Sequence, residues 1–165
     1  MIRSPKNVEW IWSPFSQLPL QDLYSILAAR QQVFVVEQNC AYLDVDGFDP
    51  VCWHLQGRNQ GTNGCRLLAY CRLIPPGARY SEASIGRVLT TVEGRGQGLG
   101  RRLMEEAIRQ AELVYPGIPV RINAQQYLEG FYRSFGFETA SEPYLEDGIV
   151  HIEMLRTAEL LRSLR

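Results

Sequence analysis

Four glycines at alternate positions, Gly94, Gly96, Gly98 and Gly100, stand directly before a helical pattern that runs to Val114. Glycine reaches positive φ and lets the backbone approach other groups closely, and the first turn of a helix leaves several N–H groups without partners. A glycine-rich turn at a helix N-terminus therefore directs amide donors and a favourable dipole toward a phosphate. The segment predicts a strand, a glycine turn and a helix that together bind an anion.

Two common phosphate loops do not match this stretch. A dinucleotide fingerprint has the spacing G-x-G-x-x-G, and its third glycine falls on Leu99 in one register and on Arg101 in the other. A Walker A loop requires Gly-Lys-Ser/Thr, and the single lysine of the chain lies near the N-terminus. What remains is the pattern R-x-x-G-x-G, formed by Arg95, Gly98 and Gly100.

The composition limits the class of protein and its partners. A chain of 165 residues with 45% hydrophobic and 21% charged residues has the size and composition of one globular domain, residues 1–165. Its net charge of −1 gives no general attraction to nucleic acid or to an anionic membrane, so the anion site must be local. No segment has the roughly 20 apolar residues of a membrane span, and the N-terminus lacks the apolar core of a signal peptide. We therefore expect a cytoplasmic protein with no nucleic-acid or membrane partner.

The cysteines and histidines form no metal-binding pattern. The four cysteines include no C-x-x-C pair, and Cys52 and His54 have no second pair at a zinc-ligand spacing. We expect no metal, and reduced cysteines that lie mostly in the core.

Hydrophobic periodicity and turn residues predict the order strand, helix, three strands, helix, strand, helix and two strands. The predicted helices cover about residues 18–39, 98–114 and 126–136, and the predicted strands cover about 8–15, 51–57, 65–77, 83–92, 120–124, 137–144 and 149–155. Asn63-Gly64 and Asp147-Gly148 predict hairpin turns. This order implies an α/β fold of the α+β kind, in which helices flank a central mixed sheet of about seven strands.

The loop pattern after a strand and before a helix resembles the acyl-CoA pyrophosphate loop of the GNAT superfamily of N-acetyltransferases. The segment INAQQYLEGFYRSFGF resembles the second signature of that family, a strand followed by a helix with Phe-Tyr and a closing Gly-Phe. The segments RQQVFVVEQNCAYLDVDGFD, CWHL and YLEDGIVHIEM resemble its ElaA-type branch, so the resemblance covers about residues 8–155. It implies a GNAT-like fold and transfer of an acetyl group from acetyl-CoA to an amine, by direct attack in a ternary complex.

The resemblance also implies where acetyl-CoA binds. Amides of the glycine loop would bind the pyrophosphate, and the strand before the loop would pair through its backbone with the pantetheine arm, as a peptide adds to a sheet edge. The alternative is that the glycines form only a structural turn. The expected cofactor-binding residues are Val88, Leu89, Thr90, Arg95, Gly96, Gln97, Gly98, Leu99, Gly100, Arg101, Asn123 and Tyr132.

Acyl transfer to an amine needs a base for the amine, donors for the developing oxyanion and an acid for the leaving thiolate. The resemblance places Tyr132 as the acid, and the alternative is a core residue on an apolar helix face. The base stays open among Glu37, His54 and His151, since histidine is the side chain whose reference pKa lies near neutrality. His54 is also interpreted as a structural strand residue. Glu37 is also interpreted as selecting a cationic amine or as a surface carboxylate.

Two further functions are compatible with the sequence. The run R-x-x-V-F resembles acyl-homoserine lactone synthases, and a non-catalytic acyl-CoA-binding module would keep the glycine loop without turnover. The acceptor is either a small molecule or the amino group of a protein, and the oligomeric state is open, a homodimer included. The segment DVDGFDP lacks the glycine and glutamate positions of a calcium loop. We interpret its carboxylates, Asp44, Asp46 and Asp49, as an acidic lid near the acceptor groove.

Overall fold

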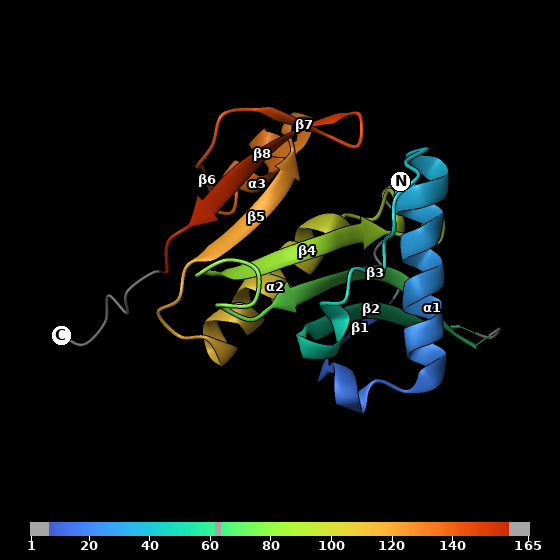
Figure 1. Cartoon of the computed structure of the whole chain (residues 1–165). Helices are drawn as coiled ribbons and strands as arrows, with labels where there is room; N and C mark the ends of the chain where they lie inside the picture. The colour runs from blue at the N-terminus through green and yellow to red at the C-terminus, as the bar shows by residue number, and fades with distance from the viewer. Residues whose placement is uncertain (1–6, 62–63, 159–165) are drawn as a thin grey trace.

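Eight strands form one mixed sheet in the computed structural model, which describes residues 7–61 and 64–158 (Figure 1). The strand order is β1-β2-β3-β4-β5-β8-β6, and β7 pairs with β8. The strands are β1 (Val8–Pro14), β2 (Trp53–Gly61), β3 (Gly64–Ile74), β4 (Ala83–Thr90), β5 (Val120–Gln125), β6 (Glu138–Thr139), β7 (Tyr144–Glu146) and β8 (Ile149–Arg156). Neighbouring strands are antiparallel except β4 and β5, which are parallel.

The expected mixed sheet is confirmed, with one more strand than the sequence pattern predicted. The strand expected over 137–144 is divided into β6 and β7, and Pro143 between them has no N–H to donate to a ladder. The turn at Asp147 and Gly148 is present, because both residues have positive φ, at 49° and 79°. Strands β2 and β3 pair as an antiparallel hairpin, whereas Asn63 of their predicted turn lies outside the described residues.

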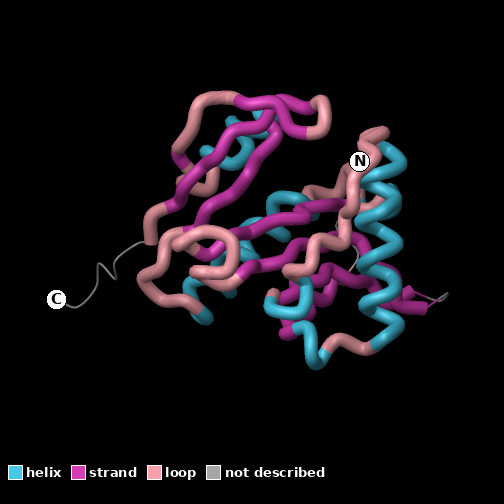
Figure 2. The backbone as a smooth tube through the Cα atoms, in the orientation of Figure 1, coloured by secondary structure: helices cyan, strands magenta, loops and turns pink. Residues whose placement is uncertain are grey.

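Helices cover both faces of the sheet (Figures 1 and 2). They are α1 (Leu20–Arg30), α2 (Leu99–Val114) and the short α3 (Glu129–Arg133). A π-helical stretch, Gln31–Glu37, continues α1, so the expected long helix over 18–39 is close to what forms. The last expected helix is shorter than predicted, because a 3₁₀ turn, Gln126–Leu128, precedes α3. Within the described residues, none of the helices combines the length and hydrophobicity that a membrane crossing requires.

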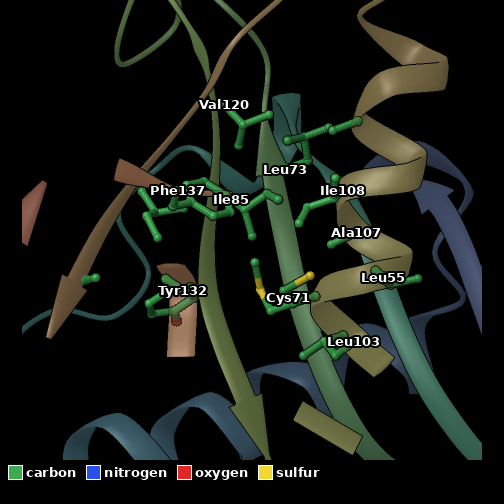
Figure 3. Packing of buried hydrophobic residues seen from close by; sticks show 14 of the residues in the cluster. Leu55, Cys71, Leu73, Ile85, Leu103, Ala107, Ile108, Val120, Tyr132 and Phe137 are labelled. Atoms are coloured by element: carbon green, nitrogen blue, oxygen red, sulfur yellow. The ribbon is translucent and has the colours of Figure 1, made fainter. Parts of the chain in front are cut away.

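The main core lies between α2 and the sheet (Figure 3). Leu103 and Ala107 of α2 are buried one turn apart, and they join the core that contains Leu73 and Ile85 of the strands. A smaller cluster on α1 contains Ile26 and three sheet residues, Leu67, Tyr70 and Leu89. Three of the four free cysteines are buried, as the sequence predicted: Cys40, Cys52 and Cys71.

Strands β4 and β5 separate soon after they begin. Their only paired positions are Ala83 with Val120 and Ser84 with Arg121. Figure 1 shows β5 diverging from β4 beyond this point. The facing edges of the two strands therefore carry backbone groups that no strand of the described sheet pairs.

Candidate active site

A cleft of about 840 Å³ lies where β4 and β5 separate. Its walls come from β4 between Ile85 and Thr90, from β5 at Asn123, and from the β7–β8 hairpin. The π-helical end of the first helix and the segment after it close another side, through residues such as Glu37 and Tyr42. The cleft therefore collects residues from chain segments more than a hundred positions apart.

The glycine loop joins this cleft at the start of α2. Gly96 and Gly98 have left-handed φ, at 73° and 69°, and Gly98 is the N-cap of the helix. Among the described residues, the amides of residues 96–101 have no hydrogen-bond acceptor. A second hollow, of about 310 Å³, lies against this loop and reaches Thr90 and Phe131. Free amides at the positive end of a helix dipole fit a phosphate group.

Gly94 serves a different purpose from the other loop glycines. A Cβ at this position would overlap the carbonyl oxygen of Leu68 in β3, because the loop packs against that strand. Gly100 has open space and an ordinary helical backbone, so its conformation does not require glycine. Gly96 and Gly98 are thus needed for their left-handed backbone, and Gly94 for the close packing of the loop against β3.

We expect Gly94→Ala to lower the free energy of unfolding by about 1–3 kcal/mol, because the added methyl group displaces either the loop or β3. Urea unfolding followed by circular dichroism measures this change. Gly100→Ala is the matched control, and it is expected to be neutral or stabilising at a helical position with free space. Equal stability of the two variants would contradict the packing role of Gly94.

Strand β4 contains a bulge beside the cleft. Tyr70 pairs with Leu89 and Arg72 with Gly86, so β4 has one residue more than β3 in this interval. Arg87 lies in the bulge with a φ of 53°, which is unusual for a residue other than glycine. After the bulge, Val88, Leu89 and Thr90 line the cleft, and their edge faces the gap toward β5.

Three buried or partly buried arginines hold the acidic segment after the first helix. Arg30 donates to Asp44 at 2.7 Å and to Asp49 at 2.6 Å, and its side chain has no exposed area. The other two arginines, Arg72 and Arg87, complete this arginine–aspartate network through ion pairs with Asp46, Asp49 and Asp44. The segment lies beside the cleft, as expected of an acidic lid near the acceptor groove, but its carboxylates are paired with arginines and leave little free negative charge.

His54 lies in the interior and does not line the cleft. Its Nδ1 is 2.8 Å from the hydroxyl of Tyr70, and its Nε2 is 3.0 Å from the carbonyl oxygen of Asp49. Burial lowers the pKa of His54, which favours the neutral ring. This placement departs from the expected role as base or acceptor contact, because both ring nitrogens are occupied and the side chain is fully buried.

Glu37 and Tyr132 both line the cleft. Glu37 Oε2 accepts a hydrogen bond of 2.6 Å from Arg95 of the glycine loop, so its charge is paired. Tyr132 comes from α3 and packs beside Phe137 (Figure 3). Burial raises the pKa of Tyr132 well above its ordinary value, so the phenol stays protonated at neutral pH. No described residue is hydrogen-bonded to its hydroxyl.

A hydrogen-bonded group on β5, β7 and β8 brings Asn123, Glu146 and His151 to the same cleft, with Tyr144 behind them. Tyr144 donates to Oδ1 of Asn123 at 2.6 Å, and Nδ2 of Asn123 donates to Oε2 of Glu146 at 2.7 Å. The ring of His151 stacks on Tyr144, and its Nε2 lies 3.9 Å from the same Glu146 oxygen. Nδ1 of His151 is 2.9 Å from the carbonyl oxygen of Ile149. A carbonyl only accepts, so Nδ1 carries a proton, and in the neutral tautomer Nε2 has the free lone pair.

The structure thus brings Glu37, Tyr132, Asn123 and His151 to one cleft beside the glycine loop, and it leaves His54 outside. Sequence reasoning missed Glu146 and Tyr144, since nothing in a polar turn signals a partner on another strand. It also missed the arginine–aspartate network, for which there was a signal: Arg72 stands inside the apolar run AYCRLI. A cation in a predicted core strand implies a buried anionic partner.

Comparisons with known proteins identify the family and the fold. Residues 75–158 match the family described as an acetyltransferase (GNAT) domain. A UPF0039 protein of Synechocystis sp. is 45% identical over 149 residues, which cover 90% of this chain and 95% of that protein. The crystal structure of an acyl-CoA N-acyltransferase from Pseudomonas aeruginosa is similar with a TM-score of 0.86 and 42% identity, over 92% of this chain and 100% of that one. Escherichia coli ElaA is similar with a TM-score of 0.83 and 38% identity, over 91% and 99%.

Proposed function

We propose, because this chain belongs to the GNAT acetyltransferase family, that it transfers an acetyl group from acetyl-CoA to an amine by direct attack in a ternary complex. The observation that carries the proposal is the run of free amides at residues 96–101, in continuity with the unpaired edge of β4. The amides of residues 99–101 are free in the first turn of any helix, and the left-handed glycines at 96 and 98 place the amides of residues 96–98 beside them. The same cleft also contains a candidate base and a candidate acid.

The donor site has two parts. The amides of residues 96–101 would bind the pyrophosphate, with Arg95 and Arg101 beside them as cations. The backbone of Val88, Leu89 and Thr90 would pair with the amide groups of the pantetheine arm. When bound, acetyl-CoA supplies a thioester carbonyl carbon and a thiolate leaving group.

We assign the acid–base roles to His151 and Tyr132. Nε2 of His151 accepts a proton from the attacking amine, whose nitrogen forms the new C–N bond as the C–S bond breaks. The hydroxyl of Tyr132 remains protonated and donates to the sulfur that departs with the C–S electron pair. His54 keeps a structural role in this scheme, and Glu37 positions Arg95 of the loop.

Calorimetric titration with acetyl-CoA tests the proposal together with a Gly98→Glu variant. We expect binding by the unaltered protein and at least about a tenfold weaker affinity in the variant, because the added carboxylate repels the pyrophosphate. Gly117→Glu is the matched control, since Gly117 has a similar φ of 77° and open space but lies beyond the far end of α2. Both variants introduce similar backbone strain, so a difference between them reports on the anion site.

Release of the CoA thiol in the presence of amines then measures transfer. Thiol release that depends on the amine supports the proposed reaction. Binding of acetyl-CoA without transfer to any amine would favour a non-catalytic module. No binding by the folded protein would overturn the proposal.

A further inference from the structure

Glu146 brings a negative charge into the cleft, and none of the arginines that the structure describes forms an ion pair with it. Three other carboxylates line the cleft: Glu37 and Asp46 are each paired with an arginine, whereas Asp147 forms no ion pair among the described residues. Glu146 differs from Asp147 because the neutral amide of Asn123 donates a hydrogen bond to its carboxylate. Arg79 also lines the cleft, but within the described ranges it forms no ion pair with Glu146. An uncompensated carboxylate at a binding site favours a cationic ligand.

The geometry around Glu146 fits one nitrogen atom of a ligand. Its Oε2 lies 3.9 Å from Nε2 of His151. Charge-assisted hydrogen bonds are about 2.8 Å long, so a nitrogen can lie between these two atoms and contact both. Nδ1 of His151 donates to the carbonyl oxygen of Ile149, so Nε2 is the acceptor in the neutral tautomer of the ring. An alkylammonium group therefore has two acceptors for two of its N–H bonds.

One oxygen of the Glu146 carboxylate is oriented by a hydrogen bond, although the side chain is 43% exposed. Burial raises the pKa of Tyr144 to about 12, so its hydroxyl stays a donor at neutral pH and fixes the amide oxygen of Asn123. The amide nitrogen of Asn123 then points to Oε2 of Glu146, the same oxygen that is nearest His151. Two strands and a hairpin thus determine where this oxygen lies.

We propose that Glu146, oriented by Asn123, binds the ammonium group of the acceptor, so that the cleft selects primary alkylamines that are cationic at neutral pH over amines that are neutral there. The inference deepens the proposed function and rests on it. The sequence analysis considered Glu37 as the residue that selects a cationic amine. The inference assigns that selection to Glu146, because Glu37 is already paired with Arg95.

The test compares benzylamine, a cation at neutral pH, with aniline, which is neutral. Each is titrated calorimetrically into the protein, with and without CoA, so the result does not require turnover. Glu146→Gln keeps an oxygen for Asn123 and removes the charge. Asp147→Asn is the matched control, because Asp147 also lines the cleft without an arginine partner among the described residues but forms no hydrogen bond or ion pair with Asn123 or His151, so the loss of its charge tests overall negative charge apart from the Glu146 contact.

We expect Glu146→Gln to weaken benzylamine binding about 10- to 100-fold and to leave aniline binding unchanged. Asp147→Asn should change either affinity by less than about threefold. The inference is overturned by equal losses for both amines, by an equal loss in Asp147→Asn, or by benzylamine binding no tighter than aniline in the unaltered protein. Thiol release with benzylamine is measured separately. Selective binding without release would support the ammonium site and contradict the proposed reaction.

Discussion

His151→Ala is expected to lower kcat for acetyl transfer by about 10²–10⁴-fold while the Kd of acetyl-CoA stays unchanged. The reason is the position of the ring. Its Nδ1 proton is committed to the carbonyl oxygen of Ile149, and its Nε2 lone pair faces the cleft beside Glu146. The hollow beside the glycine loop, which is the proposed pyrophosphate site, is lined by other residues than His151.

Steady-state thiol release and calorimetry measure the two quantities separately. Added imidazole should restore part of the lost rate to His151→Ala, since a small base can occupy the vacated space in the cleft. Tyr144→Phe is a useful comparison, because it keeps an aromatic ring beside position 151 and removes only the hydroxyl that reaches Asn123. It should raise KM for the amine through Asn123 and Glu146, with a smaller loss of kcat than His151→Ala and no response to imidazole. If kcat of His151→Ala stays within about twofold of that of the unaltered protein, or if imidazole does not restore its rate, the base is another group.

Local patterns predicted the elements because their physical causes are local. The helix from Leu99 to Val114 follows from its apolar spacing, and the hairpin at Asp147 and Gly148 follows from two residues that tolerate positive φ. The separation of β4 from β5 has no such signature. It depends on which strands become neighbours, and the crossover through α2 decides that over 29 intervening residues, 91–119.

The same contrast between local and long-range causes explains which parts of the candidate site could be predicted. The glycine loop could be predicted because its amides, its left-handed positions and the following helix lie within a few residues of one another. The role of Glu146 could not, since its hydrogen-bond partner Asn123 precedes it by 23 positions and lies on another strand. His54 illustrates the reverse case. Its residue type suggested chemistry, but burial and two hydrogen bonds give it a structural role in the proposed scheme.

Asp49→Asn is expected to lower the free energy of unfolding at pH 7 by about 3–5 kcal/mol. Asp49 accepts from Arg30 at 2.6 Å and from Arg72 at 2.8 Å, and both guanidinium groups are almost fully buried. Asparagine has nearly the same shape but no charge, so it leaves excess positive charge in the interior. Urea unfolding measures the loss. Arg133→Gln, which removes an exposed ion pair with Glu129, should leave stability nearly unchanged.

The same network predicts how stability depends on pH. Burial alone would raise the pKa of Asp46 and Asp49, but hydrogen bonds and charge from the arginines outweigh it, and the pKa of Asp46 falls to about 2. An unfolded aspartate has a pKa of about 3.9. The stabilisation is therefore complete above about pH 4 and is lost as pH falls toward 2. Asp49→Asn lacks one of these carboxylates, so its free energy of unfolding should decline less over this interval. Parallel pH profiles would instead show that Asp49 titrates normally in the folded protein, and that its charge is not what the two arginines require.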